Sequence, residues 1–382
     1  MTGSDAIVIG GGIAGVSIGA ELAAAGRSVT LVEAEETLAF HTTGRSAAHY
    51  LQNYGHPVVR LLTRASRAFF ETADQPLWSP RAFLRAGRED HAESLRADVR
   101  EGRALSPTTE FLDGDAIRDV LPVIADDVVA ALFEPDAMEL DVAAIHQTYV
   151  RFLRARDGEI RAGSRVVEIQ RGSNWTLTLD DGATLEAPIV VNAAGAWGDD
   201  VARMAGVAPV GLHPLRRSVA IVGLPADVDA DEWPLAAFER GDGSMDAYCK
   251  PEPGGLLLSP ADETPSDPCD ARAEELDIAM AIDGLHRWTT LQTRHVTTTW
   301  AGLRTFAADR NPIVGFAPDA DGFFWAVGQG GYGIQMAPGL ARAAAGLAVD
   351  GALPRDLVEL GVSAGELSPA RPGLAGELTG GH

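Results

Sequence analysis

The first 33 residues contain a glycine-rich turn between two short segments of strand character, and this turn restricts the possible fold more than any other feature. Residues 6 to 9 are uniformly apolar and typical of a buried strand, and residues 28 to 32 are typical of a second one. Between them, residues 13 to 25 fit a helix that ends at Gly26. This order of strand, turn, helix and strand predicts a βαβ unit.

The turn has the spacing GxGxxG, at Gly10, Gly12 and Gly15. The first glycine permits a tight turn, the second lets backbone N–H groups approach a pyrophosphate, and the third lets the helix pack close to the strand. Glu33 follows the second strand, where its carboxylate can accept hydrogen bonds from an adenosine ribose. Because the helix N-terminus also stabilises an anion, the segment predicts a dinucleotide site.

The composition is that of a globular chain with an acidic surface. Its 382 residues exceed one minimal domain and predict two or three. Hydrophobic residues make up 46% and charged residues 22%, which excludes a disordered or collagen-like chain. The 31 basic and 54 acidic residues give a net charge of −23, which repels phosphate backbones and anionic lipid. We therefore expect no nucleic acid partner.

The cysteines and histidines give no metal pattern. Cys249 and Cys269 form no CxxC pair, so they build neither a disulfide framework nor a thiolate zinc site, and they fit a reducing cytoplasm. The three histidines between residues 41 and 56 fit no usual zinc spacing.

The uncharged stretch 6–20 is too short and too rich in glycine to span a membrane or export the chain. We expect no metal, no transmembrane segment and a cytoplasmic location.

Two later segments repeat the pattern of an apolar strand followed by small residues. One is IVVNAAGAW at 189–197, and the other runs through a glycine loop at 330–333 into an alanine-rich helix. Three such turns predict one large dinucleotide wrapped by distant parts of the chain. Residues 211–305 alternate short strands with Pro/Gly turns, which is typical of an antiparallel sheet. The Gly- and Pro-rich tail from Gly365 is expected to be loosely ordered.

Five motifs together resemble one enzyme family. They are GGGIAG at 10–15, TGRSAAHY at 43–50, NAAGAW at 192–197, TWAGLR at 299–304 and QGGYGIQ at 329–335. They are similar to the D-amino-acid oxidase and glycine/sarcosine oxidase superfamily of FAD enzymes, and most of all to bacterial FAD-dependent D-arginine dehydrogenases. The resemblance implies non-covalent FAD and an α/β (α+β) fold, in which a Rossmann-like FAD-binding domain is interleaved with a mainly antiparallel β-sheet substrate domain.

The resemblance also divides the chain and assigns cofactor contacts. It implies an FAD-binding domain of residues 1–80, 140–210 and 296–355, a substrate domain of residues 81–139 and 211–295, and a C-terminal tail at 356–382. The implied FAD contacts are Gly10, Gly12, Ile13, Ala14, Gly15, Glu33, Arg45, Ser46, Ala47, Ala48, Val167, Ala194, Gly195, Gly330, Gly331, Tyr332, Gly333, Ile334 and Gln335. N–H groups at the start of the helix after the last glycine loop could stabilise negative charge on the flavin.

The same resemblance implies a substrate site. It places Arg217, Tyr248 and Arg304 around a substrate carboxylate, and it places His49, Tyr54 and Gly331 around the amine and Cα. Two arginines can hold a carboxylate by forked, charge-assisted hydrogen bonds and so present one face of Cα to the flavin. The amine must lose its positive charge before hydride leaves. His49, with an ordinary pKa of about 6.5, is the nearest candidate to assist.

The chain departs from the D-arginine dehydrogenases in the expected side-chain pocket. Phe83 stands where those relatives carry the carboxylate that holds a guanidinium, and Leu51 stands where they carry a small hydroxyl residue. An unpaired guanidinium buried against these two side chains would cost several kcal/mol. The expected substrate is therefore a neutral, mostly apolar D-amino acid, oxidised by hydride transfer from Cα to an imino acid that hydrolyses to a 2-oxo acid and ammonia.

Several alternatives remain at this point. Sarcosine oxidases activate O₂ with a lysine beyond the strand tyrosine, and the matching residue here is Ser259, while Lys250 lies two residues after Tyr248 on the same strand face. We expect a dehydrogenase that passes electrons to a quinone or another acceptor, with oxidase activity as the alternative. Two other enzyme functions are open, namely an oxidoreductase for a 2-hydroxy acid (2-hydroxyglutarate-like) and one for an N-methyl amino acid. A further alternative is a flavin-carrying subunit without its own substrate chemistry. An NAD enzyme would leave the C-terminal glycine loop without a cofactor part to hold.

Overall fold

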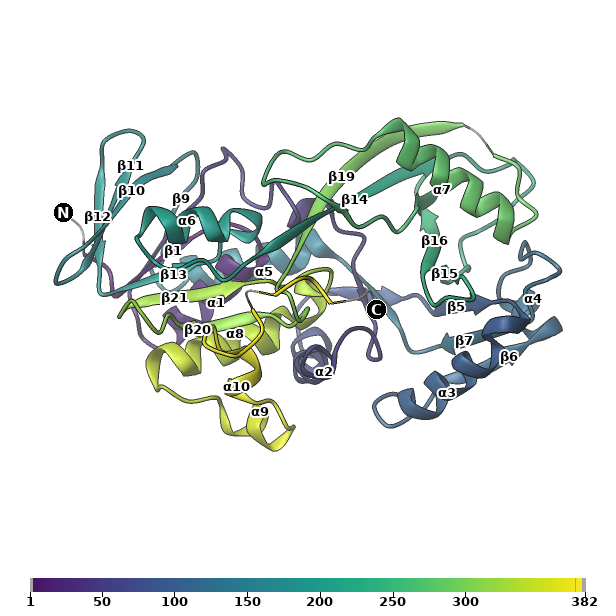
Figure 1. Cartoon of the computed structure of the whole chain (residues 1–382), viewed down its shortest axis with the longest axis horizontal. Helices are drawn as coiled ribbons and strands as arrows, with labels where there is room; N and C mark the ends of the chain where they lie inside the picture. Colours follow the sequence, from purple (N-terminus) through teal and green to yellow (C-terminus); the bar gives the residue numbers. More distant parts are fainter. Residues whose placement is uncertain (1–2, 294, 375, 380–382) are drawn as a thin grey trace.

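The glycine-rich turn belongs to a six-stranded sheet. The computed structural model describes residues 3–293, 295–374 and 376–379. The strand order is β20-β21-β13-β1-β2-β9, and all neighbours are parallel except β20, which runs antiparallel to β21 (Figure 1). The strands are β1 (Ala6–Ile9), β2 (Val29–Val32), β9 (Glu159–Arg161), β13 (Ile189–Asn192), β20 (Ile313–Phe316) and β21 (Phe323–Val327). Strands β1, β2 and β21 are buried at every residue, as expected for parallel strands covered on both faces.

Four helices pack together beside this sheet. Helix α1 packs against α5 and α8, and α8 packs against α2. Their bounds are α1 (Ile13–Ala24), α2 (Pro57–Glu71), α5 (Val142–Arg154) and α8 (Gly333–Val349). Gly10 has a φ of +113°, and a Cβ on Gly15 would lie 1.8 Å from the Gly10 carbonyl oxygen. The tight turn and the close helix–strand contact predicted for these two glycines are therefore confirmed.

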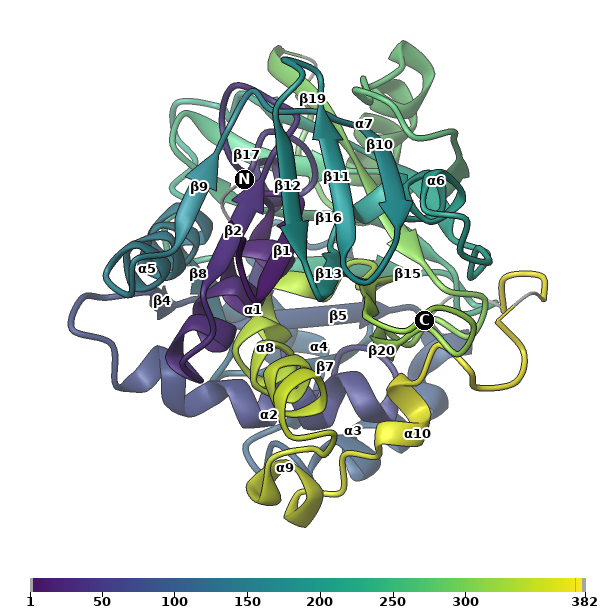
Figure 2. The same cartoon turned by 90° about the vertical axis from the view of Figure 1, so that its left-hand side faces the viewer.

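Two small antiparallel sheets flank the six-stranded one. The first is β10-β11-β12, which lies next to β1 in Figure 2. The second is β3-β8-β4. The strands are β3 (His49–Tyr50), β4 (Trp78–Pro80), β8 (Met138–Leu140), β10 (Val166–Arg171), β11 (Trp175–Leu179) and β12 (Thr184–Ala187). Nearby short helices are η1 (Thr43–Arg45), η3 (Gly195–Trp197) and α6 (Gly198–Met204).

The other large sheet has nine strands in the order β18-β14-β17-β16-β15-β5-β7-β6, with β19 paired to β14. The strands are β5 (Phe83–Gly87), β6 (Glu110–Asp113), β7 (Ala130–Glu134), β14 (His213–Val222), β15 (Leu235–Glu239), β16 (Met245–Glu252), β17 (Gly255–Ser259), β18 (Thr264–Pro265) and β19 (Val296–Phe306). All pairs are antiparallel except β5 with β15. The expected division assigned β19 to the FAD-binding segments, whereas the strand pairs with β14 along its length.

One face of the nine-stranded sheet is covered by helix α7 (Glu275–Trp288). Ile278, Ala281, Leu285 and Trp288 of this helix pack in one core with buried residues of the sheet, such as Phe238. Helices α3 (Ala92–Gly102) and α4 (Gly114–Val120) lie against β7 and the edge strand β6, and η2 (Glu89–His91) directly precedes α3. The sheet therefore has one closed face, and its opposite face is left to form the wall of a site.

The C-terminal tail is docked, which corrects the expectation of loose order for its described part. It contains α9 (Arg355–Glu359) and α10 (Ala364–Leu367). Beyond them, the guanidinium of Arg371 donates to both carboxylate oxygens of Asp309, at 2.7 and 2.9 Å, and to the carbonyl oxygens of Asn311 and Pro312. The backbone N–H of Thr379 donates to Ala308 O at 2.8 Å. Glycine content predicted flexibility, but one arginine supplies enough hydrogen bonds to anchor the segment.

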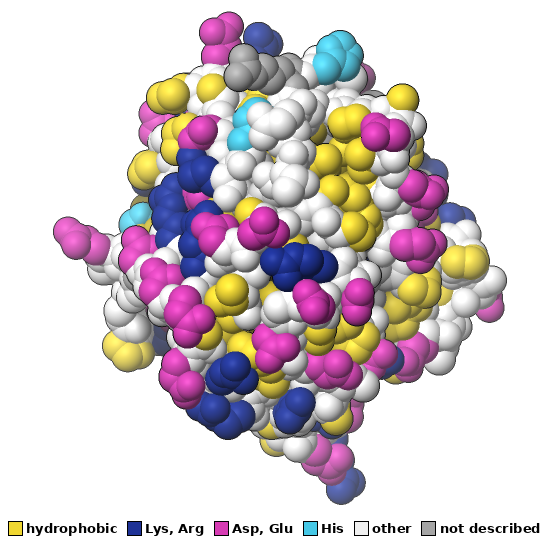
Figure 3. All heavy atoms as spheres, turned by 90° about the vertical axis from the view of Figure 1, so that its right-hand side faces the viewer, with side chains coloured by type: hydrophobic (Ala, Val, Ile, Leu, Met, Phe, Trp, Pro, Cys, Tyr) yellow, Lys and Arg dark blue, Asp and Glu magenta, His cyan; other side chains and the backbone are white. Residues whose placement is uncertain are grey.

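The surface carries charges of both signs with hydrophobic side chains between them. Figure 3 shows this for the end of the molecule that includes the nine-stranded sheet, where carboxylates and arginines are interspersed. Within the described residues, no helix combines the length and the hydrophobicity needed to cross a bilayer.

Candidate functional site

A single large cavity connects the two big sheets. Its volume is about 1180 Å³, and it extends from the glycine-rich turn after β1 to the open face of the nine-stranded sheet. The predicted site residues on its wall are Gly10, Gly12, Ile13, Ala14, Glu33, Arg45, Ser46, Ala47, Ala48, His49, Leu51, Tyr54, Phe83, Ala194, Gly195, Arg217, Tyr248, Arg304, Gly330, Gly331, Gly333, Ile334 and Gln335. The fold thus brings together segments from nine separate parts of the sequence.

Three predicted residues do not line the cavity. Gly15 lies beneath the turn, where it packs on Gly10. Val167 is 49% exposed, and its neighbour Val166 forms the wall instead. Tyr332 is buried in the core, and its ring packs edge-on against Tyr54 with 4.9 Å between centroids.

The N-terminal end of the cavity fits the pyrophosphate and ribose of a dinucleotide. Helix α1 begins there with no acidic side chain in its first turn. The N–H of Ile13 donates to the Thr43 hydroxyl at 3.0 Å, and the helix dipole and the other N–H groups of this turn are available to an anion. The carboxylate of Glu33 accepts hydrogen bonds from Gly11 N at 2.6 Å and from Glu35 N at 2.9 Å. Glu33 therefore shapes the turn in addition to the ribose contact expected of it.

His146 on α5 is a supporting residue that the sequence analysis missed. Its Nε2 lies 2.9 Å from the carbonyl oxygen of Gly11, and the side chain is buried. Burial lowers the pKa of His146, so the neutral ring donates to this carbonyl. No local signal could have identified it, because 135 residues separate the two partners.

The part of the cavity next to the N-terminus of α8 fits a flavin ring. The small side chains of Ala47, Ala48 and Ala194 leave room there, and Gly330 and Gly331 precede α8. Like α1, helix α8 starts without an acidic residue in its first turn, and its own N-cap residue makes no side-chain hydrogen bond. Its N-terminus can therefore stabilise negative charge on a ring placed against it. These donors and small residues fit FAD.

Arg45 fixes the wall rather than presenting free donors to the cavity. Its Nη1 donates to the carbonyl oxygens of Ala271 and Ala301, both at 2.9 Å, and its Nη2 pairs with Asp270. The indole of Trp300 donates back to the Arg45 carbonyl oxygen at 3.1 Å. Arg45 thus joins the TGRSAAHY segment to strand β19 and to the loop before α7.

Strand register explains which side chains of the nine-stranded sheet face the cavity. Directly paired residues lie on the same face, and along a strand every second residue does. One face of the sheet can be followed from strand to strand through four pairs, namely Arg217–Gly302, Tyr248–Ala237, Leu235–Phe83 and Phe83–Glu134. All of these residues line the cavity. The intervening residues, such as Ala220, Ala236 and Leu84, form the core under α7.

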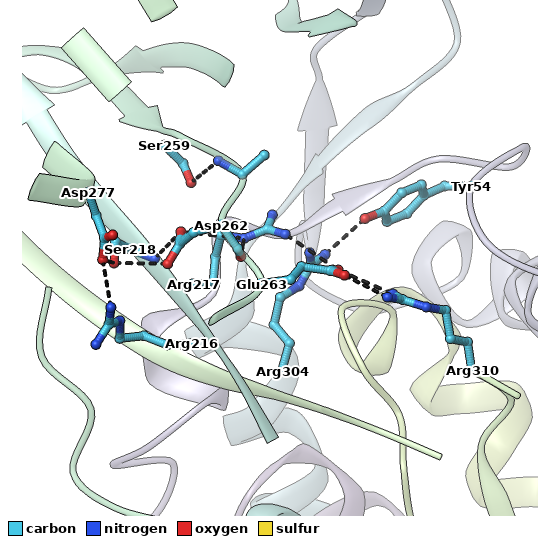
Figure 4. Close-up of polar contacts among 11 residues, drawn as sticks. Tyr54, Arg216, Arg217, Ser218, Ser259, Asp262, Glu263, Asp277, Arg304 and Arg310 are labelled. Atoms are coloured by element: carbon cyan, nitrogen blue, oxygen red, sulfur yellow. Dashed lines mark hydrogen bonds and ion pairs between the residues drawn. The ribbon is translucent and has the colours of Figure 1, made fainter. Parts of the chain in front are cut away.

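Arg217 and Arg304 meet on this face from adjacent strands (Figure 4). Nη2 of Arg304 donates to the Tyr54 hydroxyl at 2.9 Å, and its Nη1 is buried and has no hydrogen-bond partner among the described residues. The guanidinium of Arg217 lies 5.8 Å from the centre of the Tyr248 ring. Burial, and then the positive charge of Arg304, lower the pKa of Arg217. Two buried cations with spare donors favour an anionic ligand.

Acidic residues behind the pair hold it in place. The Nε of Arg217 donates to the carbonyl oxygen of Asp262 at 2.7 Å, and its Nη2 lies 3.7 Å from Oε1 of Glu263. Glu263 also accepts two hydrogen bonds from Arg310, at 3.2 and 2.6 Å. The next residue along β14, Arg216, points to the opposite face and pairs with Asp277 on α7 at 3.1 Å (Figure 4).

Gly331 is required by the position of Arg304. A Cβ at residue 331 would lie 1.8 Å from Nη2 of Arg304. Any larger residue would therefore displace this guanidinium, which explains a glycine at this place in the loop. The backbone of Gly331 and the arginine form one continuous part of the wall.

His49 also lies on the cavity wall, in an uncharged state. The residue is 7% exposed, and neither ring nitrogen makes a hydrogen bond with the described residues. Burial, and then the positive charge of Lys250, lower its pKa to about 3, although Glu139 opposes the shift. An imidazole with this pKa is a weak proton acceptor at neutral pH, which the ordinary pKa assumed from sequence did not anticipate.

The predicted side-chain pocket forms, and it has an additional polar part. Leu51 and Phe83 belong to one apolar cluster with Leu235, Tyr54 and Tyr248. The wall beside this cluster also contains Asn53, Arg85, Glu134 and Glu239, which the sequence analysis missed. Glu134 lies on β7, directly opposite Phe83 on β5. Only the pairing of these strands reveals that a carboxylate adjoins the predicted apolar pocket.

Comparison with known proteins agrees with this architecture. The protein-family model "DAO: FAD dependent oxidoreductase" matches residues 5–347. FAD-dependent oxidoreductase domain-containing protein 1 of Xenopus laevis is 25% identical over 402 residues, covering 91% of this chain and 79% of that protein. Glycine oxidase of Bacillus licheniformis is 26% identical over 348 residues, covering 87% and 90%.

Solved structures share the fold. L-proline dehydrogenase from P. horikoshii has a TM-score of 0.81 with this chain at 19% sequence identity, and the match covers 96% of this chain and 97% of the other. It has the same FAD domain and mixed, largely antiparallel second sheet. Because the family model matches most of the chain and the cavity fits the cofactor, this protein belongs to the DAO family of FAD-dependent oxidoreductases, and FAD is its cofactor.

Proposed function

We propose that the protein catalyses oxidative deamination of an amino acid, most readily a D-amino acid, by hydride transfer from Cα to the flavin. The imino acid that leaves would hydrolyse to a 2-oxo acid and ammonia. The buried pair Arg217 and Arg304, beside the flavin end of the cavity, is the observation that carries this proposal. Similarity to the curated glycine oxidase supports an amino acid as substrate. The TGRSAAHY and QGGYGIQ motifs, which resemble those of D-amino acid dehydrogenases, support the D configuration.

The protein would act mainly by binding and orienting the substrate. Bound FAD supplies the hydride acceptor. The arginine pair would hold the substrate carboxylate by forked hydrogen bonds, and the hydroxyl of Tyr54, fixed by Arg304, would close that end of the site. Orientation of this kind lowers a barrier by several kcal/mol, because less motional freedom is lost during the reaction itself. An uncharged His49 would spare the substrate ammonium the repulsion of an imidazolium.

We also propose that the reduced enzyme passes its electrons to a quinone or a similar acceptor rather than to O₂. Lys250 is the sole lysine of the chain, and it is 3% exposed and paired with Glu139 and Glu252. It is not part of the cavity wall. Ser259, at the position of the oxygen-activating lysine in sarcosine oxidases, is fully buried. Slow reoxidation of the reduced protein in air would support this, and reoxidation within seconds would contradict it.

The domain division follows from the same proposal. We propose that the segments of the six-stranded sheet, with α1, α5 and α8, bind FAD, and that the nine-stranded sheet binds substrate. Strand β19 then counts with the substrate domain, because it pairs with β14 and carries Arg304.

Anaerobic reduction of the bound flavin tests the activity directly. We expect D-amino acids to bleach the flavin absorbance, and ammonia to appear in the amount of flavin reduced. Bleaching by 2-hydroxy acids alone, without ammonia, would identify a hydroxy acid enzyme instead, since an arginine pair also fits that carboxylate. With N-methyl amino acids in the same panel, oxidation at Cα would release methylamine, whereas oxidation at the N-methyl group would release formaldehyde and leave the amino acid. No bleaching by any of these compounds would contradict the proposal and favour a flavin-carrying subunit.

A further inference from the structure

The cavity does not end at the apolar cluster around Phe83. Beyond that cluster its wall contains Asn53, Arg85 and Glu134, so a substrate held by the arginine pair would extend its side chain from an apolar section toward polar groups. This placement of the side chain rests on the proposed function, in which the substrate is an amino acid. It concerns the far end of the side chain, about which the arginine pair gives no information.

Strand pairing fixes the position of Glu134. Glu134 is the last residue of β7 and pairs with Phe83 of β5, which in turn pairs with Leu235 of β15. Paired residues share a face, so the Glu134 side chain emerges next to the two apolar ones on the cavity side of the sheet. The residue is only 4% exposed, and what it exposes belongs to the cavity wall.

Two consecutive residues link Glu134 to the arginine pair. The ring of Tyr54 packs in the cluster with Leu51 and Phe83, and its hydroxyl accepts a hydrogen bond from Arg304. The preceding residue, Asn53, interacts with the carboxylate of Glu134. The loop after β3 therefore spans the distance between the two polar ends, and the apolar side chains lie between them.

Glu134 forms no ion pair with any residue in the described part of the chain. Arg85 and Arg60 are the positive charges that act on it. The guanidinium of Arg85 is paired with Asp98 and lies 3.5 Å from Glu239, and Arg60 donates to Glu101 at 3.0 Å. Burial raises the pKa of Glu134 to about 7, even though hydrogen bonds from Asn53 and both arginines oppose the shift. A buried carboxylate that retains so high a pKa is incompletely compensated.

A second acceptor lies beside it. The amide Nδ2 of Asn53 donates to Thr109 at 3.1 Å, and its Oδ1 has no hydrogen-bond partner among the described residues. Both groups that the loop and β7 bring to this end of the cavity can therefore accept hydrogen bonds. Their natural ligand is a donor.

We propose that Glu134, assisted by Asn53, determines specificity by binding a nitrogen-centred hydrogen-bond donor at the far end of the substrate side chain, such as an amide or an amine. The methylene groups of that side chain would contact Leu51, Phe83 and Leu235. The expectation that basic amino acids are poor substrates assumed a wholly apolar pocket, and the position of Glu134 removes that assumption.

Kinetics with matched substrates test the proposal. The panel is D-leucine, D-norleucine, D-glutamine, D-lysine and D-arginine, measured with the FAD-loaded enzyme. We expect glutamine or a basic amino acid to have a higher kcat/KM than norleucine. In Glu134→Gln, the ratio of lysine to norleucine should fall at least tenfold. Glu101→Gln is the matched control, since it removes the same charge from the same end of the cavity at a side chain that is 73% exposed.

The pH profile separates recognition from a structural role. The charged groups around Glu134 are Arg60 on α2, Arg85 on β5, Asp98 and Glu101 on α3, and Glu239 on β15. As Glu134 ionises, the lysine-to-norleucine ratio should rise between pH 6 and pH 8 in the unmodified enzyme and stay flat in Glu134→Gln. Burial also raises the pKa of Glu239, so Glu239→Gln is measured in parallel and should retain the rise.

The outcomes are distinct. A norleucine preference, or an equal loss for all substrates in Glu134→Gln, would overturn the proposal and leave Glu134 a structural residue. Flavin that no amino acid reduces, in the unmodified protein as in the variants, would instead refute the proposed function on which this inference rests.

Discussion

At the scale of single residues, the site depends on charges placed where water is scarce. Arg217 and Arg304 are held by Asp262, Glu263 and Tyr54, yet Arg304 retains a buried donor without a partner within the described ranges of the chain. Such a donor is costly unless a ligand satisfies it. A carboxylate oxygen that accepts from this donor removes the cost, which makes binding more favourable. The pair should therefore bind substrates that carry a carboxylate in preference to those that lack one.

Replacement of Arg304 by lysine tests this discrimination. Lysine keeps the charge but loses the forked geometry, so we expect a cost of about 2 kcal/mol, or roughly a 30-fold rise in KM for a carboxylate substrate. Arg216→Lys is the matched control, because Arg216 lies on β14 but faces α7. A KM that changes equally in the two variants would show that the arginine pair does not hold the substrate.

Glu134 also predicts how stability depends on pH. Its pKa in the folded protein is about 7, above the ordinary 4.5, so the folded state binds this proton more tightly than the unfolded state. The free energy of unfolding should therefore fall as pH rises from below 4.5 to above 7, by at most about 3 kcal/mol. Urea unfolding at pH 5 and pH 8 measures this. In Glu134→Gln the difference between the two pH values should shrink, and an unchanged difference would contradict the assignment.

At the scale of elements, the contact between β1 and α1 sets the shape of the turn that faces the cofactor. The Gly10 carbonyl oxygen and residue 15 are so close that no side chain fits between them. A larger residue would push the helix N-terminus away from the pyrophosphate position. The N-terminus of helix α8 also lines the cavity, and α8 packs on α1, so displacement of one helix affects both.

Gly15→Val should therefore lose FAD. We expect the purified variant to have less than a tenth of the bound flavin absorbance at 450 nm, because the helix can no longer approach the strand. Gly19→Ala on the same helix is the control. A Cβ there has ordinary contacts, the nearest at 3.4 Å to Leu153, and alanine favours the helix. Full flavin content in Gly15→Val would show that this close contact is not needed for cofactor binding.

At the scale of the whole molecule, the site exists only because distant segments are fastened together. Arg45 ties the segment after β2 to β19, and Arg310 connects Glu263 in the site to Thr379 in the tail, whose carbonyl oxygen accepts from its Nε at 3.1 Å. Arg371 fastens the same tail to the loop before β20. The C-terminal tail thus supports the wall of the cavity through a chain of hydrogen bonds.

Removal of this attachment should destabilise the protein. The Arg371 side chain is 7% exposed and paired with Asp309, and loss of a buried pair of this kind costs about 3 kcal/mol. For Arg371→Ala we expect a fall in Tm of several degrees. Arg355→Ala is the control, since that tail arginine is 92% exposed and its pair with Glu359 contributes well under 1 kcal/mol. Equal Tm values for the two variants would mean that the tail does not support the fold.

The sequence by itself determined those parts of the protein whose signals are local. The glycine spacing and the apolar strands come from interactions between near neighbours in the chain, and they predicted the βαβ unit, the dinucleotide site and the glycine loop before α8. Family motifs extended this to Arg217 and Arg304, because each lies in a recognisable strand. The segments that line the cavity were therefore predictable one by one.

Only the tertiary structure decided what those segments place beside one another. The register of β5 with β7 puts Glu134 next to Phe83, and the packing of α5 puts His146 under the turn. The buried environment made His49 a weak base, and Arg371 anchored a tail whose composition indicated disorder. The physical reason is common to all four. Strand register, burial and long-range hydrogen bonds depend on residues far apart in the chain, so no local pattern of amino acids records them.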